Sequence, residues 1–105
     1  MPFYTYILKC ADGSYYTGST TELALRIAEH VNGVDPQAYT YSRRPVELVW
    51  SQEFVTHDEA FRAEHQIKGW SRAKKEALIR NDWETIHQIV LQENIRRKAK
   101  KSGLG

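Results

Sequence analysis

The chain of 105 residues is long enough for one domain with a modest hydrophobic core. Its composition, with 41% hydrophobic and 27% charged residues, is typical of a soluble globular protein. No apolar run approaches the roughly 20 residues that span a bilayer, so we expect no membrane partner. The N-terminus lacks the pattern of a signal peptide, and the single cysteine, Cys10, excludes an internal disulfide. Both features favour a cytoplasmic location.

The net charge of +2 hides an uneven distribution. From Asn94 onward the chain carries five basic residues and no acidic one, whereas the remainder has ten basic and thirteen acidic residues, a net charge of −3. The five basic residues are Arg96, Arg97, Lys98, Lys100 and Lys101. Such basic tails often bind polyanions. The alternative interpretation is a solvated helix end whose cations suit the C-terminal end of the helix dipole.

The N-terminal third predicts a β-hairpin followed by a helix. Residues 3–10 are rich in aromatic and β-branched types, Asp12-Gly13 indicates a turn, and residues 15–18 form the return strand. The pattern of a capping box at Ser19-Thr20-Thr21-Glu22 then predicts a helix that starts near Thr20 and ends at Gly33. The buried stripe of this helix is expected to consist of Leu23, Ile27 and Val31.

The length of the hairpin turn decides which tyrosines share a face. A two-residue turn would place Tyr16 and Tyr6 on opposite faces of the sheet. A three-residue turn with Gly13 in the left-handed conformation would place Tyr16 opposite Leu8 and Tyr6 opposite Gly18. Both phenols would then lie on one face, and we predict this second register.

The rest of the chain predicts one more strand and three helices. Residues 46–54 alternate between apolar and polar types, which predicts a strand, and a capping box at 56–59 predicts a helix through Lys68. A short helix is expected over 72–80 after Ser71, and a last one from Trp83 to about Lys98, capped by Asn81 or Asp82. Strands followed by helices indicate an α+β fold. We expect residues 1–82 to form the main body of one domain, to which residues 83–105 add a helix and the basic tail.

Glu64 is an unusual residue for its place on the helix expected after the third strand. The apolar stripe of that helix is predicted to consist of Ala60, Phe61 and Ile67. Glu64 lies among these residues, and burial of an unpaired carboxylate is costly. One interpretation is a salt bridge to Arg26 or Lys68. The other is a divalent metal ligand, because Mg²⁺ is often held by one or two carboxylates together with water and phosphate oxygens.

Arg26 and His30 lie one turn apart on the first helix. Arg26 is either a surface residue paired with Glu22 or Glu29, or a phosphate clamp, because its planar guanidinium matches phosphate oxygens in a bidentate manner. His30 is a candidate for proton transfer or orientation.

Tyr6 and Tyr16 have two interpretations. A phenol beside a phosphate can orient water, or act as a general base if a metal ion and Arg26 lower its pKa from about 10. The alternative is that the two rings only pack across the hairpin.

The order and spacing of these residues resemble the GIY-YIG nuclease family over nearly all of residues 3–80. Tyr4-Thr5-Tyr6 stands where the family has GIY, and Tyr16-Thr17-Gly18 where it has YIG. Arg26 matches the family's helix arginine, His30 its frequent histidine four residues later, and Glu64 its metal-binding glutamate. Small stand-alone members, some of them linked to DNA repair, are most similar. The chain departs from the pattern at both central isoleucines, which are threonine, and at residues 34–37, where relatives often have Gly and Lys.

The resemblance implies a three-stranded antiparallel sheet flanked by helices, and a nuclease that hydrolyses phosphodiester bonds in DNA, with RNA as the alternative. Glu64 would hold one Mg²⁺ or Mn²⁺, Arg26 would neutralise charge, and Tyr16 would activate water. Tyr6 and His30 would position the water or relay protons. The residues expected to contact nucleic acid are Gly18, Arg43, Arg44 and Lys68, together with the basic tail.

Two rival functions belong to other classes. Aromatic strands beside basic residues also suit a non-catalytic nucleic-acid-binding module. Because no separate DNA-binding domain is evident, a protein partner that supplies substrate specificity is expected, and the chain can equally be an adaptor for a nuclease partner.

Overall fold

The computed structural model describes the backbone of residues 2–102 and the side chains of residues 2–97. The chain divides into two compact units, one that extends to Gly69 and one that begins at Trp70. No helix within the described range is both long and apolar enough to cross a membrane.

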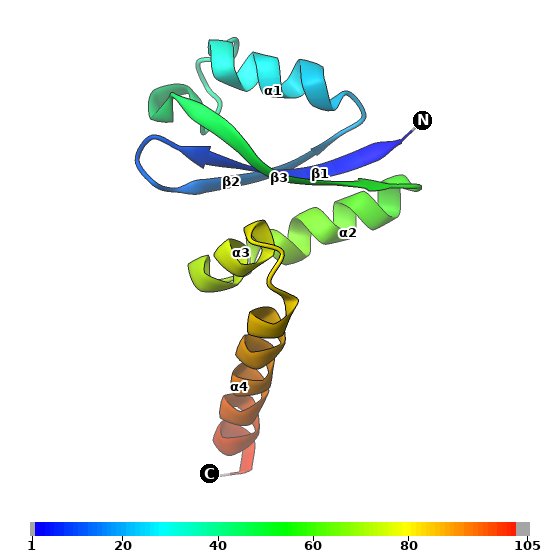
Figure 1. The fold of residues 1–105 in the computed structure, drawn as a ribbon, viewed down its shortest axis with the longest axis vertical. Helices are drawn as coiled ribbons and strands as arrows, with labels where there is room; N and C mark the ends of the chain where they lie inside the picture. The colour runs from blue at the N-terminus through cyan, green and yellow to red at the C-terminus, as the bar shows by residue number, and fades with distance from the viewer. Residues whose placement is uncertain (1, 103–105) are drawn as a thin grey trace. The chain divides into compact units, whose positions relative to one another are not determined.

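The first unit is built on a three-stranded antiparallel sheet of strand order β2-β1-β3. Its elements are β1 (Phe3–Cys10), β2 (Tyr15–Thr20), α1 (Leu23–Asn32), the 3-10 helix η1 (Tyr41–Arg43), β3 (Val46–Phe54) and α2 (His57–Lys68). Figure 1 shows α1 on one face of the sheet and α2 on the other. The α+β class and the three-stranded antiparallel sheet are therefore confirmed.

The hairpin has the three-residue turn and the register that the sequence predicts. Gly13 has a φ of 85°, in the left-handed region that glycine tolerates. The register pairs Leu8 with Tyr16 and Tyr6 with Gly18. Side chains alternate between faces along a strand, so Tyr6 and Tyr16 lie on the same face of the sheet.

One cluster of the core of the first unit lies between the sheet and α1. Four buried residues form it, Tyr6, Leu8, Cys10 and Val46, and the half-buried side chains packed against them are Tyr16, Leu23 and Ile27. Full burial of a large apolar side chain contributes about 1.5–3 kcal/mol relative to exposure. On the opposite face, Thr5 Oγ1 donates a hydrogen bond of 2.8 Å to the carbonyl of Ala60 and so joins the sheet to α2.

The predicted capping box before α1 is wrong. β2 continues through Thr20, and α1 begins only at Leu23. Glu22 occupies the N-cap and its side chain makes no capping hydrogen bond. Thr20 Oγ1 instead accepts a 3.0 Å hydrogen bond from the backbone N–H of Glu22, which supports the bend between strand and helix.

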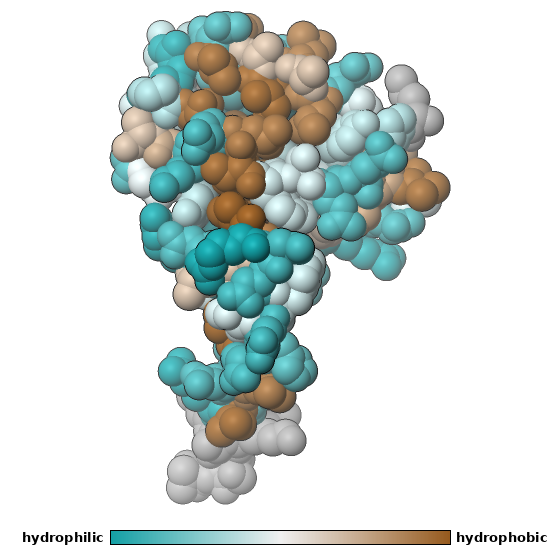
Figure 2. All heavy atoms as spheres, in the orientation of Figure 1, coloured by the Kyte–Doolittle hydropathy of each residue, from teal (hydrophilic) through white to brown (hydrophobic). Residues whose placement is uncertain are grey.

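The buried stripe of α1 also differs from the prediction at its C-terminal end. Val31 is 47% exposed, whereas His30 is buried. The face that packs on the sheet therefore runs through Leu23, Ile27 and His30, at the i, i+4, i+7 spacing of one helix face. Figure 2 shows hydrophobic residues gathered over α1 and the sheet on the face in view.

In α2 the capping residues are as the sequence predicts, but one apolar residue expected to be buried is exposed. Thr56 Oγ1 accepts from the backbone N–H of Glu59 at 3.2 Å, as the capping box predicts. Phe61, expected in the buried stripe, is 47% exposed, and its ring packs against that of His65 with centroids 4.2 Å apart. Ala60, the neighbour of Phe61, is buried in the core. The buried face of α2 is therefore narrower than the stripe of apolar residues in its sequence.

β3 contains an irregularity that breaks its expected alternation. Trp50 pairs with Ile7 but Leu48 pairs with Leu8, which leaves Val49 as an extra residue in β3. A bulge of this kind changes the face on which the following residues point.

The second unit consists of α3 (Arg72–Ile79) and α4 (Trp83–Ser102). Ser71 caps α3, and Asp82, not Asn81, caps α4 by accepting from the backbone N–H of Thr85 at 3.1 Å. α4 is longer than the predicted helix. Of the basic tail, Arg96 and Arg97 are exposed, and the side chains of Lys98, Lys100 and Lys101 lie outside the described residues. That the two units form one domain remains our proposal.

Candidate functional site

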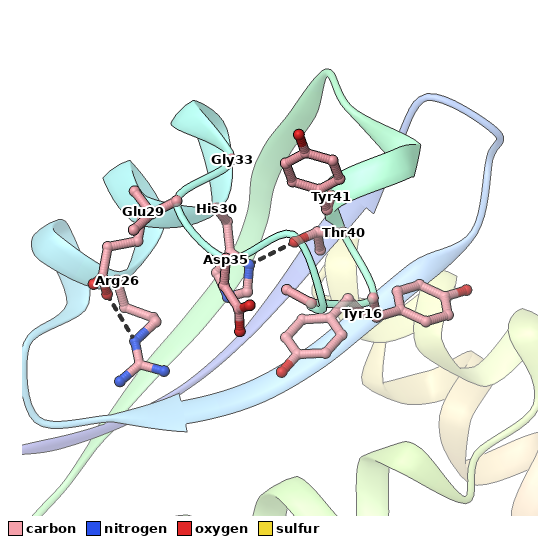
Figure 3. Close-up of a pocket in the computed structure, with 11 residues that line it drawn as sticks. Tyr16, Arg26, Glu29, His30, Gly33, Asp35, Thr40 and Tyr41 are labelled. Carbon is pink, nitrogen blue, oxygen red and sulfur yellow. Dashed lines mark hydrogen bonds and ion pairs between the residues drawn. The ribbon is translucent and has the colours of Figure 1, made fainter.

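A cavity of about 330 Å³ opens between α1, the loop that follows it and β2. Its lining includes Tyr16 from β2, Arg26 and His30 from α1, and Asp35 and Thr40 from the loop (Figure 3). The structure thus brings three of the predicted site residues together around one hollow.

His30 lies at the inner wall of the cavity with both ring nitrogens engaged. Nδ1 is 2.7 Å from Thr40 Oγ1, and Nε2 is 3.2 Å from the hydroxyl of Tyr6. Burial lowers the pKa of His30, and the charge of Arg26 lowers it further, against a smaller opposing effect of Glu29. The imidazole is therefore neutral at neutral pH.

Tyr6 lies behind the cavity wall and is fully buried. Burial raises its pKa far above that of a free phenol, Tyr16 and Glu64 raise it as well, and Arg26 opposes them. Tyr6 therefore keeps its proton. Gly18 lies against its ring, and a Cβ at Gly18 would come within 2.5 Å of the Tyr6 hydroxyl oxygen. The structure places Gly18 as a packing partner of Tyr6 inside the sheet.

Tyr16 is the tyrosine of the pair that faces the cavity. Its ring lies 5.1 Å from the His30 ring and stacks on Tyr39 at 5.9 Å, measured between centroids. The guanidinium of Arg43 lies over the other ring of this stack, 3.8 Å from the Tyr39 centroid. Tyr39 was not among the residues predicted for the site, although an aromatic residue beside Thr40 in a polar loop is a usable signal.

Arg26 is the cation of the cavity. Its Nε lies 3.2 Å from Glu29 Oε1, and both side chains are about half exposed. The surface ion pair considered from the sequence is thus present, and the remaining guanidinium donors are available to a ligand. Asp35 adds a second carboxylate to the lining, and its Oδ1 accepts from the backbone N–H of Gln37 at 2.9 Å.

Glu64 lies on α2 with both carboxylate oxygens occupied. Ser19 Oγ donates to Oε1 at 2.5 Å, and Lys68 Nζ lies 2.6 Å from Oε2. Burial raises the pKa of Glu64, but the hydrogen bonds from Lys68 and Ser19 outweigh it and hold the pKa below its ordinary value. The carboxylate is therefore charged at neutral pH, and of the two salt bridges considered, the one to Lys68 is present.

The five predicted catalytic residues fall into two groups on either side of β2. Tyr16 points to the α1 face, whereas Ser19, three positions along the strand, points to the α2 face and contacts Glu64. Glu64 is accordingly absent from the lining of the cavity. β2, which separates them, is an edge strand of the sheet.

The oxygen ligands at Glu64 suit a hard cation that binds few protein side chains. Among the described residues no group of three or more His, Cys, Asp or Glu side chains could hold a metal ion. One charged carboxylate beside the Ser19 hydroxyl fits Mg²⁺ or Mn²⁺, since such ions keep several water or phosphate ligands. The Lys68 ammonium occupies Oε2 in the structure and would compete with the ion.

The other predicted nucleic-acid contacts already have partners within the protein. Arg43 Nε lies 3.1 Å from Asp12 Oδ2, and Arg44 Nε donates to the carbonyl of Tyr41 at 2.9 Å. The Arg44 guanidinium lies over the Tyr41 ring, 4.6 Å from its centroid. Both arginines are thus held on the η1 segment beside the cavity.

Residues 2–77 match the family profile described as the GIY-YIG catalytic domain. The chain belongs to the GIY-YIG family. Curated relatives of this chain include a UPF0213 protein of Halobacterium salinarum, 48% identical over 76 residues, which are 72% of this chain and 97% of the relative. A UPF0213 protein of Staphylococcus saprophyticus is 49% identical over 76 residues, which are 72% of this chain and 92% of the relative.

Two solved structures are similar to this chain in sequence and fold. The solution NMR structure of the UPF0213 protein BH0048 from Bacillus halodurans is 46% identical with a TM-score of 0.50, over 75% of this chain and 83% of that one. The solution NMR structure of EF2693 from E. faecalis is 36% identical with a TM-score of 0.55, over 77% of this chain and 85% of that one. The GIY-YIG family is of nuclease type, and the resemblance recognised in the sequence is confirmed.

Proposed function

We propose that the chain is a metal-dependent nuclease that hydrolyses phosphodiester bonds in nucleic acid, with DNA as the main substrate. One observation carries the proposal: Tyr16, Arg26 and His30, which come from two different elements, line a single cavity. A guanidinium, a phenol and a neutral imidazole are groups that bind a phosphate and move protons around it. A cytoplasmic location and a partner that supplies substrate specificity belong to the same proposal.

Arg26 is the proposed phosphate ligand of the cavity. Its charge is permanent, and the ion pair with Glu29 fixes the orientation of the guanidinium while leaving donors unused. Positive charge beside the reacting phosphate stabilises the transition state, in which negative charge builds up on the phosphate oxygens.

Tyr16, rather than Tyr6, is the proposed group that activates water. Tyr6 is buried and its pKa is strongly raised, so it is a poor base. Tyr16 faces the cavity next to the His30 ring. Tyr6 and His30 would position the reacting groups through their hydrogen bond.

Glu64 and Ser19 are the side chains that we propose to hold Mg²⁺ or Mn²⁺. Such an ion, when bound, polarises a phosphoryl oxygen and stabilises the leaving oxygen. Glu64 supplies a carboxylate that is already ionised at neutral pH. Lys68, released from Glu64, would contact a substrate phosphate. Arg43 and Arg44 in the first unit, and the basic tail in the second, are further proposed phosphate contacts.

A cleavage assay tests this function. Wild type is incubated with single-stranded, duplex and branched DNA and with RNA, in Mg²⁺ or Mn²⁺, beside Tyr16→Phe and Glu64→Gln. Tyr16→Phe is expected to lose activity by about 10²–10⁴-fold, the range typical of general acid–base groups. Glu64→Gln is expected to lose the activity that depends on the metal ion. Tyr4→Phe is the matched control, since the Tyr4 hydroxyl donates to Glu53 outside the cavity. Equal cleavage by wild type and both variants would show that the assigned site is wrong.

A non-catalytic nucleic-acid-binding module is the second candidate. The stack of Tyr16, Tyr39 and the Arg43 guanidinium favours it, because bases stack on aromatic rings without regard to sequence. Binding of oligonucleotides without any cleavage that depends on Mg²⁺ would support this candidate over the nuclease.

A further inference from the structure

Large apolar side chains are exposed in a regular row along α4. Trp83, Leu91 and Ile95 are 55%, 44% and 65% exposed, and His87, also exposed, completes a row with a spacing of four residues. Residues four apart form one ridge on the surface of a helix. We call this row the α4 stripe, and Figure 2 shows hydrophobic residues exposed along α4. Exposed apolar surfaces of this kind mark sites of interaction.

The α4 stripe lies away from the face of α4 that contacts α3. On that inner face Ile86 is buried, and Glu93 Oε1 lies 2.9 Å from Nζ of Lys74, a residue of α3. At 100° per residue, Leu91 and Ile95 lie about 140° and 180° around the helix from Ile86. α4 therefore has apolar residues on two sides, and α3 packs on the side that the stripe does not occupy.

α4 also lies outside the part of the chain that the family shares. The match to the family profile ends at residue 77, and α4 begins at Trp83. In the relative from Halobacterium salinarum, the 76 matched residues account for 97% of the protein, which leaves almost nothing to correspond to the 20 residues of α4. The stripe is therefore not a surface that the core of the family domain needs for its completion.

The charges of α4 are complementary to those of a second α4 that runs in the opposite direction. Asp82 and Glu84 stand at its start, and the five basic residues of the tail stand at its end. An antiparallel pair brings the acidic start of each helix beside the basic end of the other, as a two-fold interface requires, whereas a parallel pair brings like charges together. The tail has more cations than the two carboxylates can neutralise, so it can still contact phosphates.

We infer that α4 is a dimerisation surface, which pairs through the α4 stripe with the antiparallel α4 of a second copy of this chain. Full overlap of two stripes places Trp83 beside the partner's Ile95, and His87 beside the partner's Leu91. Trp83 Nε1 donates to Asn81 Oδ1 at 2.7 Å, so its polar group is satisfied and the ring is free to pack. The inference does not depend on nuclease activity, and a dimer would carry two copies of the candidate site.

Sedimentation equilibrium of the full chain, from about 1 µM to 500 µM, tests the dimer. Wild type is expected to dimerise, and Leu91→Glu should weaken the association at least about tenfold, because it would bury a charge among apolar side chains. Gln92→Glu is the matched control, since it adds the same charge at a neighbouring exposed residue outside the stripe. A wild type that stays monomeric, or equal weakening in both variants, would overturn the inference.

Glu84→Gln tests the direction of the pairing. In an antiparallel dimer it removes an attraction to the partner's basic end, so association should weaken about two- to fivefold. In a parallel dimer it would relieve the repulsion between two carboxylates and strengthen association. Glu47→Gln, at an exposed glutamate of β3, is the control for loss of charge. Stronger or unchanged association of Glu84→Gln would overturn the antiparallel arrangement.

The outcome is separate from that of the proposed function. Leu91 is exposed, so Leu91→Glu should keep the fold, which far-UV circular dichroism checks. If wild type dimerises through α4 but cleaves no nucleic acid, the nuclease proposal fails while the dimer stands. If wild type cleaves as a monomer at all concentrations, the dimer is excluded while the proposed function stands.

Discussion

Gly18 and Tyr6 face each other across β1 and β2, and the Tyr6 phenol fills the space that a side chain at Gly18 would need. A Cβ built at Gly18 would lie 2.5 Å from the phenol oxygen and 2.7 Å from Cζ. Because Tyr6 is buried and hydrogen-bonded to His30, it has no room to move away. The glycine is thus required by its packing against the Tyr6 ring.

Gly18→Ala should destabilise the protein by about 1–3 kcal/mol, the usual cost of overpacking a tight core. The free energy of unfolding, measured by urea denaturation, checks this. Gly69→Ala is the control, since a Cβ there meets no atom closer than 3.6 Å. A similar loss of stability in both variants would mean that glycine flexibility, not the Tyr6 contact, is responsible.

Thr17→Val should stabilise the protein by about 1 kcal/mol, because it replaces a buried hydroxyl, which has no partner among the described residues, with a methyl group of similar size. Thr5→Val on the same face should do the opposite, since the Thr5 hydroxyl bonds the carbonyl of Ala60. The Tm of each variant, measured by thermal unfolding and compared with that of wild type, tests both predictions. Equal shifts of Tm in one direction would contradict the assignment of the two hydroxyls.

Stability should depend on pH through His30. Its folded-state pKa lies below the ordinary 6.5, so the unfolded chain binds this proton more readily. The stabilisation is therefore complete above pH 6.5 and is lost as the pH falls through the folded-state pKa. Urea denaturation of wild type and His30→Gln between about pH 7.5 and pH 5 isolates the effect, since the difference between them should shrink on acidification. A constant difference would contradict it.

Asp35→Asn should strengthen the binding of a nucleic acid. The cavity holds Asp35 and Glu29 against the single cation of Arg26, and a unit charge near a surface changes binding by about 1 kcal/mol, or roughly fivefold. Fluorescence anisotropy with a labelled oligonucleotide measures the change, which should diminish at high salt. Asp58→Asn, at an 84% exposed side chain on α2, removes the same charge as a control. Equal gains in both variants would indicate a general charge effect.

Lys68→Met should tighten the binding of Mn²⁺ to the protein alone. The Lys68 ammonium lies 2.6 Å from Glu64 Oε2 and competes with a cation there. Removal of one positive charge is expected to increase affinity about fivefold, as titration calorimetry can measure. Lys9→Met, at an exposed lysine of β1, is the control. Weaker binding in Lys68→Met than in wild type would contradict the proposed metal site.

The sequence predicted the elements whose causes are local. The Gly13 turn, the register of the hairpin and the caps at Thr56 and Ser71 depend on a few neighbouring residues, and all are as expected. The start of α1 was missed because the Ser19 hydroxyl bonds Glu64, a residue 45 positions away, instead of capping the helix.

Which residues around the cavity are buried was also harder to predict, because burial there depends on contacts between distant parts of the chain. His30 is buried although Val31, the more apolar neighbour, is exposed, because two hydroxyls satisfy both ring nitrogens. One of these hydroxyls belongs to Thr40 in an irregular loop, where no periodic pattern shows which side chains point inward. Candidate residues were therefore identified by type and spacing, while the bonds that hold them depend on tertiary contacts.

Because β2 divides the candidate site, ligand binding would affect the exposure of the edge of the sheet. A ligand that reached both Tyr16 and Glu64 would pass around the free edge of this strand, because the two side chains lie on opposite faces. The edge of a sheet is also where unpaired backbone groups invite another chain to add itself. A substrate bound there would shield the protein from edge-to-edge self-association, so that solubility would increase with occupancy of the site.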